Sequence, residues 1–66
     1  MNATQKAIVE CAQLCERALN RVARNEARGL AVAADEWRER AEWWACQAFR
    51  ELDADLAEQA LARVAA

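Results

Sequence analysis

The sequence predicts an all-α protein, on three observations of composition and pattern. The chain of 66 residues has no proline, one glycine and 18 alanines, and alanine is the best helix former whereas glycine and proline are the worst. Hydrophobic residues recur at helical spacing along most of the chain. Two segments carry capping-box sequences, which mark helix starts. We expect one domain, residues 1–66, formed by a small three-helix bundle: a long antiparallel hairpin of residues 3–28 and 30–52, and a short helix over residues 55–65.

The first predicted helix begins after Asn2, because Asn2 with Gln5 three residues later forms a capping box. Gly29 is the natural left-handed residue just beyond its end. A break at Asn25, with Asn25 capping the second helix, is the alternative. The apolar stripe of this helix consists of Ile8, Cys11, Ala12, Cys15, Ala18, Leu19 and Val22.

The second predicted helix is the central element, because it holds all three tryptophans and the only phenylalanine. Trp43 and Cys46 fall opposite its stripe and Phe49 to the side, so its second half must be covered on two faces. A turn at Gly29 would place this helix antiparallel to the first. Its stripe consists of Leu30, Ala34, Trp37, Ala41, Trp44, Ala45, Ala48 and Leu52.

The third predicted helix begins near Asp55, because Asp55 and Glu58 form a second capping box. Its apolar face should fold back over Phe49 and Cys46, and whether it also covers Trp43 is left open. The residues of that face are Leu56, Ala57, Ala60, Leu61 and Val64.

Composition argues against an enzyme. The chain has no histidine, serine or tyrosine, so it lacks an imidazole base, a serine nucleophile and a phenol acid. We expect no cofactor.

No signal peptide or membrane span is apparent, and the scarcity of lysine beside abundant arginine and alanine is typical of a GC-rich bacterial or phage gene. We therefore expect a cytoplasmic location in a bacterial host. A domain of this size is marginally stable alone, which favours oligomerisation, for example as a homodimer.

The three cysteines allow three interpretations: a metal site, a disulfide within the first predicted helix, or small buried residues. Cys11 and Cys15 lie one helical turn apart, and Cys46 lies on another predicted helix. Thiolates are ligands for Cu(I) or Zn, and the run CAQLC from Cys11 to Cys15 resembles the cysteine-rich four-helix bundles that store copper. The alternative function is therefore a thiolate metal site completed by dimerisation. The favoured interpretation is that these cysteines are small buried hydrophobic residues.

A row of arginines lies opposite the apolar stripe of the first predicted helix. Such a row could bind phosphates, since arginine makes bidentate contacts with them, and a small nucleic-acid-binding regulator is the second alternative. The net charge of −2 and the absence of aromatic residues within the row make a solvated face the favoured interpretation. The row consists of Arg17, Arg21, Arg24 and Arg28.

Acidic residues concentrate in the second half of the chain. From Asp35 onward eight acidic side chains accompany four arginines, whereas the first 34 residues carry three acidic and five basic side chains. A carboxylate patch beside an exposed tryptophan is typical of a surface that docks onto a basic groove. Glu36 and Arg40 are expected to form an ordinary ion pair four residues apart. The candidate partner-binding residues are Asp35, Glu39, Glu42, Trp43, Glu51, Asp53, Asp55 and Glu58.

In size, helicity, acidic balance and lack of catalytic residues, the whole chain resembles the small inhibitors encoded by phages and mobile elements, among them the anti-CRISPR proteins. This resemblance is one of type and rests on no motif. It implies binding to a host nucleoprotein complex, a CRISPR effector in particular, whose DNA-binding channel the acidic side chains would occupy in place of phosphates. The favoured function is thus a non-enzymatic protein-interaction module that inhibits such a complex.

Overall fold

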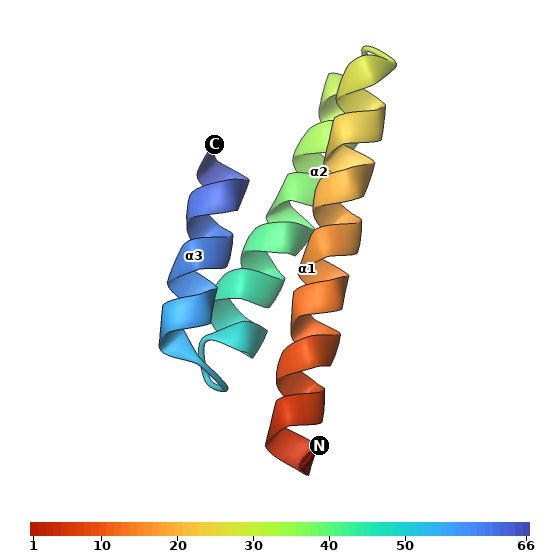
Figure 1. Ribbon diagram of the computed structural model, residues 1–66. Coiled ribbons are helices and arrows are strands. Elements are labelled where there is room, and N and C mark those ends of the chain that lie inside the picture. Colours follow the sequence, from red (N-terminus) through yellow and green to blue (C-terminus); the bar gives the residue numbers. More distant parts are fainter.

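Three helical segments form the molecule, as the sequence predicts. The structure, a computed structural model, describes the backbone of residues 1–66 and all side chains except those of residues 47 and 48. The three segments are α1 (Ala3–Ala27), a continuous rod of α2 (Ala31–Trp43) and the π-helix η1 (Trp44–Phe49), and α3 (Ala54–Ala65). Figure 1 shows α1 and α2 side by side and antiparallel, with α3 against the far end of the α2–η1 rod. The molecule measures 41 × 18 × 14 Å.

Both ends of α1 follow from local sequence signals. The Gln5 amide donates to the Asn2 side chain at 2.8 Å, and the Asn2 amide donates to the Gln5 side chain at 3.0 Å, so the predicted capping box is present. Gly29 adopts a φ of 74° in the turn that follows α1, as expected. The alternative break at Asn25 is wrong: α1 continues past this residue, whose side-chain amide donates to the carbonyl of Arg21 at 2.8 Å.

The second helix runs without interruption from Ala31 to Phe49, but its last six residues are wound as the π-helix η1. In a π-helix each amide bonds to the carbonyl five residues back, so a residue lies nearly above the one five positions before it. Phe49 therefore lies on the same face as Trp44 and is buried. The predicted position of Phe49 to the side of the stripe assumed uniform α-helical winding. That assumption fails at η1.

The predicted stripe of the second helix is correct in its centre and wrong at its start. Ala34, Ala41 and Ala45 are buried, whereas Leu30 is 49% exposed. Leu30 precedes α2 as its N-cap residue, and its amide donates to the carbonyl of Asn25 at 2.8 Å in the turn. The side chain of Ala48, also assigned to this stripe, lies outside the described residues.

The predicted cap of the third helix is wrong by two residues. α3 begins at Ala54, and the Asp53 carboxylate accepts a hydrogen bond from the Leu56 amide at 3.1 Å. Asp53 is extended, with φ −157° and ψ 103°, as an N-cap residue should be. Asp55 lies within the first turn of α3 instead, where its charge still suits the helix dipole.

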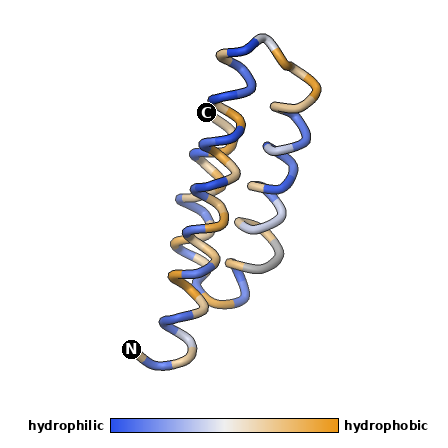
Figure 2. Tube along the Cα trace, turned by 90° about the vertical axis from the view of Figure 1, so that its right-hand side faces the viewer, coloured by the Kyte–Doolittle hydropathy of each residue, from blue (hydrophilic) through white to orange (hydrophobic). Residues whose placement is uncertain are grey.

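Two adjoining apolar clusters form the core, and small residues make up most of both. Hydrophobic and hydrophilic positions alternate along the helices (Figure 2), as amphipathic packing requires. The α2–η1 rod contacts both other helices, whereas α1 and α3 approach each other much less closely. One cluster contains Cys15, Ala18, Ala41, Ala45 and Val64, and the other contains Cys11, Phe49 and Ala57.

Candidate protein-interaction surface

Trp43 is the most prominent exposed aromatic side chain of the described residues. It is 48% exposed, so α3 leaves it uncovered, which decides the arrangement that the sequence left open. Its ring packs edge-on against Trp44, with ring centroids 4.9 Å apart and planes at 89°. Trp44 is half-buried against both core clusters. Trp43 is thus an exposed ring held by a ring that belongs to the core.

Carboxylates surround Trp43 on α2. One surface hollow is lined by Trp43 with Glu36, Glu39 and Arg40, and a second by Trp43 with Glu39, Glu42 and Cys46. We name Glu36, Glu39, Glu42 and Trp43 the Trp43 surface. Glu39 and Glu42, both predicted site residues, are exposed and form no ion pair with any side chain that the structure describes. Their charges are therefore available to a partner.

Glu36 and Arg40 both line a hollow beside Trp43, although they were expected to pair with each other. In place of the expected ion pair with Glu36, the Arg40 guanidinium lies over the Trp37 ring, 4.4 Å from its centroid. A guanidinium over an indole face is a favourable cation–π arrangement. Helical spacing alone places Glu36 near Trp43, and assigning it to an ion pair with Arg40 hid this signal.

The remaining predicted partner-binding residues are not part of the Trp43 surface. Asp35 is exposed and pairs with Arg38 at 3.3 Å. Asp53 caps α3 in place of the expected Asp55. Glu51, Asp55 and Glu58 are exposed around the turn into α3. Neither hollow beside Trp43 is lined by any of these C-terminal residues.

The arginine row of α1 is exposed, as the sequence predicts. Arg21 also lies over the Trp37 ring, 5.3 Å from its centroid. Trp37 therefore contacts guanidinium groups from two helices, Arg21 of α1 and Arg40 of α2. This gives part of the row a packing role beside any electrostatic one.

The cysteines divide into two buried thiols and one exposed thiol. Cys11 and Cys15 lie in the core, where burial raises the pKa of both thiols. The Cys15 thiol donates to the carbonyl of Ala41 at 3.7 Å. Cys46 is exposed, so the expectation that the third helix covers it is wrong. Among the described residues, no group of three potential ligands is arranged to hold a metal ion.

Two further findings complete this description. Within the part of the chain that the structure describes, no helix combines the length and the apolar character that a membrane span requires. In comparisons with protein-family models, with curated proteins and with solved structures, none matched this chain.

Proposed function

We propose that this protein is a non-enzymatic interaction module that docks onto a basic protein surface through the Trp43 surface. The observation that carries the proposal is the half-exposed Trp43 ring among the carboxylates of Glu36, Glu39 and Glu42. Tryptophan is enriched among the residues that contribute most to protein binding. The surrounding carboxylates would steer a basic partner toward the ring and fix its register.

The partner class that we propose is the nucleic-acid-binding channel of a host nucleoprotein complex, a CRISPR effector in the first instance. Such channels present arginine and lysine side chains to phosphates. Carboxylates can pair with these cations in place of phosphates, and an indole ring offers a cation–π contact that a phosphate cannot. Binding would then inhibit the complex by competing with its nucleic acid.

The experiment is a competition assay with CRISPR effector complexes purified from bacteria with GC-rich genomes. Labelled target DNA is bound to the complex, and its displacement by the protein is followed by fluorescence polarisation. Wild-type protein is expected to displace the DNA. Trp43→Ala should weaken inhibition by about 30-fold, the loss that corresponds to a binding hot spot. Glu42→Lys should also weaken inhibition, and its effect should grow as the salt concentration is lowered.

Two control variants locate the surface. Glu10→Lys makes the same charge change on the exposed side of α1 and should leave inhibition unchanged. The triple change of Glu51, Asp55 and Glu58 to lysine tests the acidic group beside α3, without disturbing the Asp53 cap. Loss of inhibition with this triple variant but not with Trp43→Ala would place the interaction beside α3 and refute the Trp43 surface. No displacement of DNA from any complex tested would refute the proposed inhibition.

A further inference from the structure

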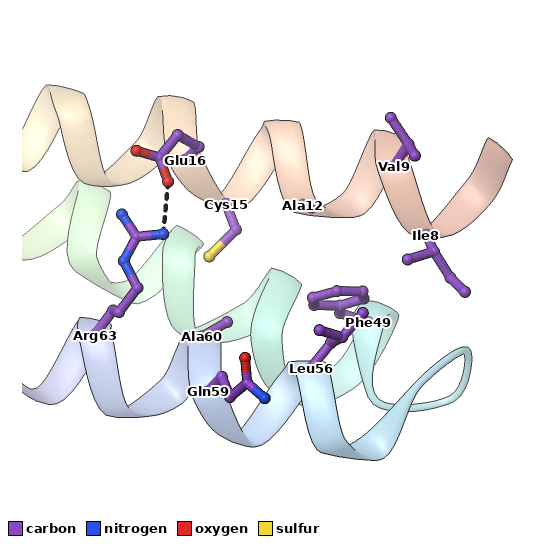
Figure 3. A pocket seen from close by; sticks show the side chains of 10 residues that line it. All are labelled: Ile8, Val9, Ala12, Cys15, Glu16, Phe49, Leu56, Gln59, Ala60 and Arg63. Atoms are coloured by element: carbon purple, nitrogen blue, oxygen red, sulfur yellow. Dashed lines mark ion pairs between the residues drawn. The ribbon is translucent and has the colours of Figure 1, made fainter. Parts of the chain in front are cut away.

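An open apolar groove separates α1 from α3. It holds about 260 Å³ and is lined by ten residues. Figure 3 shows Ile8 and Val9 of α1 at one end, Leu56 of α3 on the opposite wall, and Phe49 between them. Val9 is 40% exposed and Leu56 is 38% exposed. The groove therefore presents large apolar side chains to solvent on both of its walls.

The groove carries no net charge. Of the residues that line it, only Glu16 and Arg63 are charged, and they pair with each other across the groove at 2.7 Å. The other polar lining residue is Gln59, which is neutral. Helical spacing places Lys6, Glu10 and Arg17 toward the opposite side of α1. A depletion of charge at the centre of an apolar patch is typical of a protein interface.

Neutrality also selects the kind of partner. In a symmetric dimer the same patch of both copies meets, so any net charge on the patch would meet its own sign. This groove avoids that repulsion, although the chain as a whole carries a net charge of −2. In a dimer formed through the Trp43 surface, by contrast, the carboxylates of one copy would face those of the other and repel them. The groove is thus the face on which two copies can meet.

The amount of exposed surface supports the same occupant. The chain exposes 4704 Å², whereas a folded monomer of 7.4 kDa is expected to expose roughly 4200 Å². Among the described residues, no large side chain is fully buried. This excess of about 500 Å² belongs to the whole elongated molecule, which measures 41 × 18 × 14 Å, and it leaves surface for an interface with a second copy.

We propose that two copies of this chain associate through the α1–α3 groove, as a symmetric dimer in which Val9 and Leu56 of each copy pack against the groove of the other. A small ligand fits less well, because small-molecule sites usually enclose about 300 to 1000 Å³ and this smaller groove is open. The groove shares no residue with the hollows of the Trp43 surface. The dimer can therefore be tested independently of the proposed function.

The test is the molar mass of the full chain in solution, measured by sedimentation equilibrium over a range of concentrations. At about 100 µM, in the range of ordinary weak association, the wild-type mass should approach twice the 7.4 kDa of one chain. Val9→Glu and Leu56→Glu should each raise the dissociation constant at least about tenfold, because dimerisation would bury an unpaired carboxylate. Both side chains are partly exposed in one copy, so the helices should persist by circular dichroism.

Val32→Glu is the matched control, because Val32 is 74% exposed at the start of α2, away from the groove. This variant should dimerise like the wild type. A monomeric wild type at every concentration would overturn the proposal, and so would a dimer that Val32→Glu weakens as much as Val9→Glu does. A dimer that survives both Val9→Glu and Leu56→Glu would also overturn it, since the copies would then meet elsewhere.

Discussion

The Arg63 guanidinium of α3 lies 2.7 Å from the Glu16 carboxylate of α1. Among the described side chains, no other ion pair joins these two helices. The hydrogen bond from Arg63 lowers the pKa of Glu16 from its ordinary value, and the same bond raises the pKa of Arg63. This pair links α3 to α1 at one end of the groove (Figure 3).

The stability that this pair contributes should depend on pH. A carboxyl with a lowered pKa stabilises the folded state above its ordinary value of 4.5, and this contribution is lost as the pH falls through the folded pKa. Glu16→Gln should therefore reduce the free energy of unfolding at pH 7, by less than about 1 kcal/mol because both side chains are largely exposed. The difference from wild type should vanish well below pH 4.5.

Urea unfolding at neutral and acid pH measures this difference. Glu10→Gln is the control, because Glu10 lies one and a half turns away on α1 and makes no ion pair with a described side chain. An equal loss of stability in Glu16→Gln at both pH values would show that the carboxylate charge is not what stabilises the fold.

The cap of α3 gives a sharper prediction. Asp53→Ala removes the acceptor of the Leu56 amide hydrogen bond and should lower the free energy of unfolding by about 1 kcal/mol, the usual value of an N-cap. Asp55→Ala removes only a charge near the helix start, which contributes about 0.3 to 1 kcal/mol. Thermal or urea unfolding of the two variants compares them directly. If Asp55→Ala were the more damaging change, Asp55 would be the N-cap residue, as the capping-box sequence predicts.

The helix caps show why local signals predicted some elements and misplaced others. Asn2 with Gln5 and the single Gly29 act through adjacent backbone groups, so the sequence alone predicts them correctly. At α3 two acidic residues, Asp53 and Asp55, could each cap the helix, and Glu58 favoured the wrong one. The choice depends on where the chain leaves η1, which is a matter of tertiary packing.

The π-helix η1 explains the buried position of Phe49. Uniform helical spacing predicted the buried Ala34, Ala41 and Ala45 correctly, because α2 has regular winding there. Beyond Trp43 the winding changes, and nothing in the local sequence marks that change. Phe49 consequently moves into the core. Cys46 lies opposite the stripe as predicted and stays exposed because α3 does not cover it. Helical spacing correctly places Glu39, Glu42 and Trp43 on one side of α2, because these residues precede η1. Their role in binding a partner stays a prediction.

The contact between α1 and α2 should be sensitive to added volume. Ala41 is fully buried, and its carbonyl accepts the hydrogen bond from the Cys15 thiol. Ala41→Leu would force the two helices apart and should destabilise the fold by about 1 to 3 kcal/mol or more. Ala31→Leu, at the exposed start of α2, is the control and should be nearly neutral. Urea unfolding of both variants provides the measurement, and equal stabilities would mean that the contact tolerates a larger residue.

Thiol reactivity should distinguish the three cysteines. Cys46 is exposed, whereas Cys11 and Cys15 are buried and burial raises their pKa values. The thiolate is the reactive species, so a raised pKa and burial both slow the reaction of the two core thiols. With a disulfide reagent such as Ellman's reagent, one thiol per folded chain should react rapidly and two slowly. Cys46→Ser should abolish the rapid phase.

Cys11→Ser is the control and should leave the rapid phase unchanged. The two slow thiols should react at the rate of local or global unfolding, and urea should accelerate them as it populates the unfolded state. Three equally fast thiols in the folded chain would contradict the burial of Cys11 and Cys15. That result would also favour the alternative function, the thiolate metal site, because all three sulfurs would then be accessible to a metal ion without unfolding of the helices.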